Sequence, residues 1–335
     1  MIGIDIGSKS IKIVELSKSG SSWILKSSGA VGYNGQTPDK IIDENVFKKI
    51  ADLIRNIIKK VEIKTQEVNI SLPESVVFTR LIKFPLLSEE EVAAAVKWEA
   101  EQYIPIPTSE AVIQYTVLEK KANSTQTSVL LVATPKSVVE KFVKVLQLAG
   151  LTPVVAETEL TALARSLAPD TGVSLLLDIG FSSTDMAIIK DSSILFTRSI
   201  AVAGEAFTRA VSQSLGIEPT QAEEYKKTYG LVENQLEGKV KNALDPIFRV
   251  IVEEIKKAIQ FYKSEEKGDA PTSIVLTGGA STMPGIVPFL TQNLGIETVV
   301  GDPFGKVTMD DETKKSLENY ASLYSAAVGL AMRDD

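Results

Sequence analysis

The chain has 335 residues, 44% of them hydrophobic, and a formal net charge of −7. It contains no cysteine and no histidine, which excludes disulfides, thiolate metal sites and catalytic triads built on histidine. The acidic balance argues against nucleic-acid binding, and no apolar run reaches the ~20 residues of a membrane helix, so we expect a cytoplasmic globular protein of two domains without direct membrane insertion.

The first part of the chain predicts a mixed α/β layer. Alternating apolar and polar residues over 1–34 predict three antiparallel strands, and apolar residues at helical spacing predict a helix over about 39–60. The segment around 67–73 is then expected to form another strand. Three strands, a helix and a strand in this order are typical of an α/β fold.

Residues 83–153 predict an insertion into this first part. One of its helices begins at Ser88, where Glu91 completes a capping box. The pattern of the first part resumes at Pro153, so the elements before it form a small α/β unit of their own. These elements are expected at 76–87 (strand), 88–103 (helix), 111–119 and 127–133 (strands) and 135–149 (helix).

The stretch SLLLDIGFSSTDMAII (174–189) predicts a hairpin with a polar tip. A buried strand ends at Asp178, Gly180 lets the backbone bend, and hydroxyl groups follow at Ser182, Ser183 and Thr184. Carboxylates, hydroxyls and backbone N–H groups are what hold a phosphate chain and its Mg2+. An ordinary tight hairpin between two core strands is the alternative interpretation.

The N-terminus repeats this hairpin. Asp5, Ile6 and Gly7 align with Asp178, Ile179 and Gly180, and the same alignment places Ser10 on Ser183 and Lys12 on Asp185. The repeat predicts two similar halves whose hairpins face each other around phosphate groups. The first hairpin adds the positive charges of Lys9 and Lys12, whereas the second keeps an additional acid.

Other segments complete the pattern. A short helix begins with Glu157 and Glu159, and Glu157 either makes a favourable contact with the helix dipole or enters the cleft to orient water or a metal. Residues 205–266 are expected to be almost wholly helical. A later strand leads into the turn at 277–280, whose glycines allow close approach to a flat ligand, and the last helix is expected over about 313–332.

Taken in order, the two DIG hairpins, the Glu157 helix and the TGGAS turn resemble the phosphate-1, connecting, phosphate-2 and adenosine motifs of the actin, Hsp70 and sugar-kinase superfamily. Within it, the segments GIDIGSKSIKIVEL and FPLLSEEEVAAAVKWEAEQYIPIP resemble the PilM family of type IV pilus assembly proteins, and next the cell-division protein FtsA. The resemblance implies an actin-like (ribonuclease H-like) α/β fold of duplicated domains with an inserted 1C-type subdomain. The implied subdomains are 1A (1–82 and 154–170), 1C (83–153), 2A (171–204 and 270–335) and a helical 2B (205–269).

The resemblance also implies a site for ATP and Mg2+, with at most slow hydrolysis. Asp5 and Asp178 would bind Mg2+ through water, and Glu157 would position the attacking water. The remaining implied contacts are with the phosphates (Gly7, Ser8, Lys9, Ser10, Gly180, Ser182, Ser183 and Thr184), with the ribose or base (Glu223 and Lys226) and beneath the adenosine (Gly278, Gly279 and Ala280).

A partner is implied as well. PilM-like proteins bind the N-terminal cytoplasmic tail of the membrane protein PilN in a groove between 1A and 1C, and they link the pilus alignment complex to the motor. The resemblance therefore implies an adaptor recruited to the inner face of the cytoplasmic membrane. FtsA-like proteins usually end in a membrane-binding helix, whereas this chain ends at Asp335 directly after the last expected helix, which favours the PilM interpretation.

Three alternatives stay open. The chain is also compatible with an FtsA-like cell-division protein and with a self-associating filament protein. A small-molecule kinase of the same fold would need a base in the cleft for the acceptor hydroxyl, and Asp185 is the candidate for that role.

Overall fold

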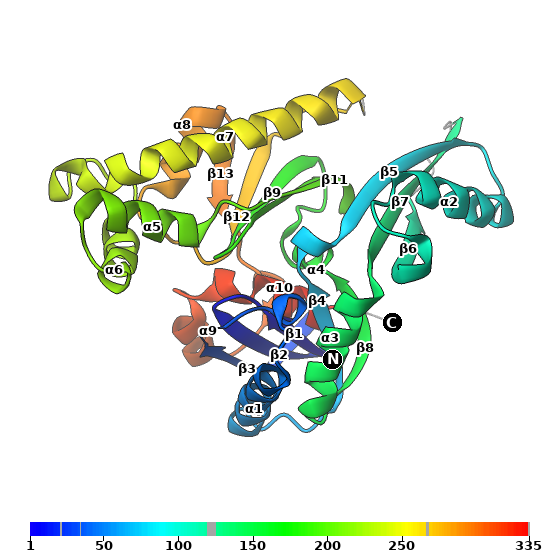
Figure 1. Cartoon of the computed structure of the whole chain (residues 1–335), viewed down its shortest axis with the longest axis horizontal. Helices are drawn as coiled ribbons and strands as arrows, with labels where there is room; N and C mark the ends of the chain where they lie inside the picture. Colours follow the sequence, from blue (N-terminus) through cyan, green and yellow to red (C-terminus); the bar gives the residue numbers. More distant parts are fainter. Residues whose placement is uncertain (21, 34, 119–124, 266–267, 334–335) are drawn as a thin grey trace.

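The computed structural model describes residues 1–20, 22–33, 35–118, 125–265 and 268–333. Two large sheets form the body of the molecule, and a smaller third sheet lies beside them (Figure 1). Most of the expected loop between the two strands of the insertion (119–124) and the last two residues of the chain (334–335) lie outside the described residues.

The first sheet has six strands in the order β14-β3-β2-β1-β4-β8. Strand β2 pairs antiparallel with β1 and with β3, whereas β4 pairs parallel with β1 and with β8. The strands are β1 (Ile2–Ile6), β2 (Ser10–Ser19), β3 (Ser22–Gly32), β4 (Glu67–Leu72), β8 (Thr152–Thr158) and β14 (Val307–Thr308).

The second sheet repeats the arrangement of five of these strands, all except β14. Its order is β11-β10-β9-β12-β13, with the same antiparallel and parallel pairings as in β3-β2-β1-β4-β8. The prediction of a duplicated α/β fold is therefore confirmed. The strands are β9 (Val173–Ile179), β10 (Thr184–Lys190), β11 (Ser193–Ile200), β12 (Ser273–Thr277) and β13 (Glu297–Val300).

Helices α1 (Glu44–Lys60) and α3 (Lys136–Leu148) pack together with the first sheet. Asp43 caps α1, and Ile50, Ile54 and Ile57 recur at helical spacing, so one face of the helix is buried in the core. Phe142 of α3 is buried in the same core. Helix α3 was expected within the insertion, but its apolar face packs with the first half.

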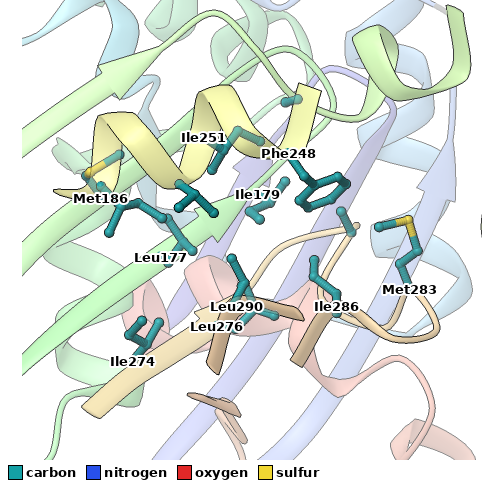
Figure 2. Packing of buried hydrophobic residues seen from close by; sticks show 14 of the residues in the cluster. Leu177, Ile179, Met186, Phe248, Ile251, Ile274, Leu276, Met283, Ile286 and Leu290 are labelled. Atoms are coloured by element: carbon teal, nitrogen blue, oxygen red, sulfur yellow. The ribbon is translucent and has the colours of Figure 1, made fainter. Parts of the chain in front are cut away.

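One face of the second sheet is covered by helices that lie between β11 and the end of the chain, and α4 (Glu159–Leu167) packs on the other face. Figure 2 shows Phe248 and Ile251 of α7 together with Leu177 and Met186 of the sheet, and these residues belong to one hydrophobic core. The expected helical segment is present, and its longest helix accommodates Pro246. The helices are α5 (Gly204–Leu215), α6 (Pro219–Tyr229), α7 (Lys239–Glu265) and α8 (Ile286–Leu294).

The small sheet has the order β5-β7-β6 and its own core, to which helix α2 contributes. Ser88 and Glu91 form the expected capping box at the start of α2. The elements are β5 (Phe78–Pro85), α2 (Glu89–Tyr103), β6 (Ala111–Val117) and β7 (Gln126–Pro135). This unit therefore runs from Phe78 to Pro135, a shorter segment than the expected 83–153, because α3 and β8 pack and pair within the first half.

Helices α4 (Glu159–Leu167) and α10 (Ser325–Ala331) lie at the centre of the molecule (Figure 1). The expected helix over 313–332 is divided into α9 (Asp311–Leu317), a 3-10 turn and α10. Helix α10 contacts β1 and α4. The end of the chain therefore packs on the first half, whereas the implied subdomain 2A includes residues 270–335. None of the helices in the described residues combines the length and the apolar character needed to span a bilayer.

Candidate functional site

The β1–β2 hairpin places an acid and a base side by side. Asp5 pairs with Lys12 across the two strands, and Lys12 Nζ donates to Asp5 Oδ2 at 2.9 Å. The turn is closed by Gly7, whose N–H donates to the Ser10 carbonyl at 3.1 Å. Asp5 is only 6% exposed, so this ion pair forms in a largely water-free environment.

The β9–β10 hairpin has the same register and the same turn. Asp178 pairs with Asp185 at the positions of Asp5 and Lys12, and the Gly180 N–H donates to the Ser183 carbonyl at 3.0 Å. The sequence alignment of the two hairpins thus corresponds to a structural repeat. The one chemical difference at the paired position is an aspartate in place of a lysine.

The two hairpin tips meet across a cleft of about 1350 Å3. Ser182 Oγ donates to Ser8 Oγ at 3.0 Å, and the Lys9 ammonium lies 4.3 Å from the centre of the Phe181 ring. Fourteen of the predicted site residues line this cleft: Asp5, Gly7, Ser8, Lys9, Ser10, Asp178, Gly180, Ser182, Ser183, Glu223, Lys226, Gly278, Gly279 and Ala280.

Two predicted site residues do not line the cleft. Thr184 is fully buried, and its hydroxyl donates to the Val202 carbonyl at 2.7 Å. Glu157 binds Arg165 through two hydrogen bonds of 2.6 and 2.8 Å, and Arg333 at 2.8 Å. Glu157 therefore connects β8, α4 and the C-terminal segment, and the expectation that it enters the cleft is corrected.

Glu159 lines the cleft in place of Glu157. Strand β8 continues to Thr158, whose hydroxyl accepts from the Thr161 N–H and caps α4, so Glu159 is the first helical residue. The predicted helix start at Glu157 is therefore two residues too early. The preference of threonine for the N-cap position was the signal that could have located it.

Glu159, Asp178 and Asp185 form an acidic cluster whose nearest oxygens all lie within 4.8 Å of one another. Burial, followed by the charges of Asp185 and Asp5, raises the pKa of Asp178 to about 7. Burial and the three neighbouring aspartates also raise the pKa of Glu159, whereas Lys12 opposes that rise. A cation would relieve this repulsion, and carboxylate oxygens are the donors that Mg2+ prefers.

Glu223 and Lys226 line the cleft from α6. Lys226 Nζ donates to Glu223 Oε2 at 2.6 Å, to Thr208 Oγ1 at 3.0 Å and to the Gly204 carbonyl at 3.1 Å. Burial would raise the pKa of Glu223, but the hydrogen bonds from Lys226 and Thr208 lower it to about 2. Glu223 is therefore an ionised acceptor at neutral pH, suited to binding hydroxyl groups.

The glycine turn after β12 packs directly against the second hairpin. Gly278 has φ +87°, and a Cβ atom there would lie 2.1 Å from Asp178 Oδ1. The Ala280 N–H donates to the Ile179 carbonyl at 3.1 Å. Only glycine fits at position 278, because the turn must approach the Asp178 carboxyl so closely.

The cleft thus carries both positively and negatively charged groups. Lys9, Lys12 and turn N–H groups suit an anion such as a phosphate chain, while the acidic cluster suits a divalent cation. A typical small-molecule site measures about 300–1,000 Å3, so this cleft has room for a ligand as large as a nucleoside triphosphate.

Several known proteins are similar to this chain. A solved structure described as a PilM-PilN type IV pilus biogenesis complex has 27% sequence identity and a TM-score of 0.84, covering 99% of this chain and 97% of that one. MreB5 of Spiroplasma citri bound to AMPPNP (16% identity, TM-score 0.56, covering 98% of this chain and 93% of that one) shares the actin-like fold.

Curated relatives cover less of the chain. The cell division protein FtsA of Pseudomonas aeruginosa is 28% identical over 176 residues, which are 47% of this chain and 41% of FtsA. The chain therefore spans less than half the length of the curated relatives it matches.

A family model is decisive about membership. The model described as type IV pilus assembly protein PilM matches residues 3–335, nearly the whole chain. The similar PilM-PilN structure covers the same extent, including the inserted sheet. The chain belongs to the PilM family of type IV pilus assembly proteins.

Proposed function

We propose that the chain is a nucleotide-binding adaptor of type IV pilus assembly. Its cleft binds ATP with Mg2+, and the inserted sheet and its borders bind the N-terminal cytoplasmic tail of a PilN-type membrane protein. The main support for nucleotide binding is that the same hairpin occurs twice, with the same register, and that both copies line one cleft. The similar structure of a PilM-PilN complex supports the peptide partner.

Each part of the cleft has a distinct role in this proposal. Lys9, Lys12 and the hydroxyls and N–H groups of both turns hold the phosphates, while Asp5 and Asp178 accept hydrogen bonds from the water shell of Mg2+. Bound Mg2+ neutralises charge on the phosphoryl oxygens. Glu159 holds the attacking water, and the ionised Glu223 accepts from ribose hydroxyls. We propose slow hydrolysis at most, since turnover depends on how closely that water is placed.

The adaptor acts in the cytoplasm and reaches the inner face of the membrane through its PilN-type partner. From there it connects the alignment complex with the motor of the pilus machine.

Two titrations test the proposal. Calorimetry with Mg·AMPPNP should give saturable binding that EDTA weakens, because the acidic cluster repels a metal-free triphosphate. Fluorescence anisotropy with a labelled peptide of the PilN N-terminal tail should give saturable binding as well. Absence of nucleotide binding would rule out the cleft assignment, and absence of peptide binding would rule out the adaptor.

A small-molecule kinase is the second candidate, because Asp185 lines the cleft. In such an enzyme its carboxylate would accept the proton of the acceptor hydroxyl. Rapid phosphate transfer from ATP to a member of a sugar panel would favour the kinase. Light scattering after addition of ATP tests the filament alternative.

A further inference from the structure

Glu74 lies in a one-turn helix, η2 (Glu74–Val76), that connects β4 of the first sheet with β5 of the inserted sheet. Its neighbours Pro73 and Ser75 line the cleft, whereas Glu74 itself is 4% exposed. The same short segment therefore forms a wall of the cleft and carries a carboxyl group into the interior.

This carboxyl lies where all three sheets meet. The hydroxyls of Thr197, Thr158 and Thr79 lower the pKa of Glu74, opposing the larger rise that burial causes. These threonines lie on β11 of the second half, at the end of β8 in the first half, and on β5 of the inserted unit. Strand β11 also packs against both η2 and β5, so the three sheets meet around one side chain.

The position is costly for a glutamate. Glu74 Oε2 has no hydrogen-bond partner in the part of the chain that the structure describes. Burial, followed by the charge of Asp185, raises the pKa of Glu74 to about 8. An apolar side chain of similar volume would fill this space at lower cost, so the presence of a carboxyl suggests a role beyond packing.

A short path joins Glu74 to the acidic cluster. Asp185 pairs with Ser199 on β11, and the Ser199 hydroxyl interacts with the Asp185 carboxyl. Thr197 lies two residues before Ser199, so both side chains project from the same face of β11. A ligand that moves Asp185 therefore acts on the strand that contacts Glu74.

We propose that Glu74 couples occupancy of the cleft to the position of the inserted sheet, so that nucleotide and peptide change each other's affinity. Glu74 touches neither ligand and acts as a positioning residue. The proposal rests on the proposed function, because it needs a nucleotide in the cleft and a peptide at the inserted unit. Any such coupling must be reciprocal, the same factor being measured from either ligand.

The test compares peptide affinity with and without saturating Mg·AMPPNP, by anisotropy with the labelled PilN-tail peptide. In the wild type the affinity should change by about 5-fold or more, the lower end of ordinary allosteric coupling, and calorimetry of the nucleotide with and without peptide should give the same factor. Glu74→Gln keeps the shape of the side chain, and Thr197→Val removes its partner hydroxyl on β11. Each should bring the factor close to one while each ligand alone still binds with near wild-type affinity.

Glu110→Gln, at an exposed acid of the inserted unit, is the matched control and should leave the factor unchanged. Wild-type protein that binds both ligands without mutual effect would overturn the coupling and leave the proposed function standing. Full coupling in either Glu74→Gln or Thr197→Val would also overturn it. A wild type that binds neither ligand would instead refute the proposed function itself.

Discussion

Replacing Asp178 with asparagine should stabilise the ligand-free protein and abolish its response to Mg·ATP. Asp178 lies between Asp185 and Asp5 in a largely buried cleft, and these surroundings raise its pKa to about 7. When folding raises the pKa of an acid, the protonated acid stabilises the folded protein, and this stabilisation is complete below the unfolded pKa of 3.8. That contribution is lost as the pH rises through about 7, because the folded protein must then hold the charged form.

The size of the effect follows from this pKa. A rise from 3.8 to about 7 corresponds to ~4 kcal/mol of folding free energy at pH 8. Asp178 is partly exposed to the cleft, and water and Lys12 reduce the cost, so we expect about 1–3 kcal/mol. For a chain of this length that is a gain of about 1–4 °C in Tm for Asp178→Asn.

Thermal unfolding of both proteins between pH 5 and pH 8, with and without Mg·ATP, checks this prediction. The difference in Tm should grow with pH, since asparagine does not titrate. Ligand at 100 times its Kd should stabilise the wild type by about 2.7 kcal/mol, and the variant by almost nothing. A variant that is no more stable than the wild type at pH 8, yet keeps the full Mg·ATP response, would refute both the electrostatic reasoning and the metal assignment.

Four further substitutions separate the cleft from the scaffold around it. Gly278→Ala should abolish nucleotide binding in a fluorescence titration, because its Cβ would lie 2.1 Å from Asp178 Oδ1. Gly329→Ala should cost at least about 1–3 kcal/mol of stability in chemical denaturation, because its Cβ would lie 1.8 Å from a carbonyl oxygen of α4. Glu157→Gln should lower stability by about 1–3 kcal/mol, since two arginines lose a charged partner, and should leave nucleotide affinity unchanged. Glu159→Gln should show the reverse: stability should not fall, and any release of phosphate from ATP should be lost in a phosphate-release assay.

The hairpins were predictable because their information is local. A strand that ends in Asp-x-Gly, a short polar tip and a second strand leave few choices of register. Lys12 pairs with Asp5 and Asp185 pairs with Asp178, so the two aligned residues occupy equivalent positions in their hairpins. Because residues directly opposite each other on paired strands have neighbouring side chains, the register alone determines which side chains lie side by side.

The position of the acid after β8 was not predictable in the same way. Glu157 and Glu159 are two residues apart, and both are compatible with a helix start. Pairing with β4 extends β8 to Thr158, and this long-range interaction decides that Glu157 faces the arginines and Glu159 the cleft. Local propensity contains no information about that extension.

The insertion borders and the chain end depend on long-range packing as well. Helix α3 follows β7 without a break in pattern, and only its packing on α1 assigns it to the first half. Helix α10 returns to β1, where Gly3 allows contact too close for a larger residue. Amphipathic periodicity predicts that a helix buries one face, but it does not predict which sheet covers that face.

The difference between the two hairpins at the paired position, Lys12 against Asp185, suits a duplicated scaffold to an asymmetric ligand. If both paired positions carried lysine, the cleft would attract phosphate but leave no acidic surface for a metal. If both carried aspartate, the cleft would repel the phosphates. Lys12 in one hairpin and Asp185 in the other give the cleft both a positive and a negative group, which a triphosphate with a divalent cation would match.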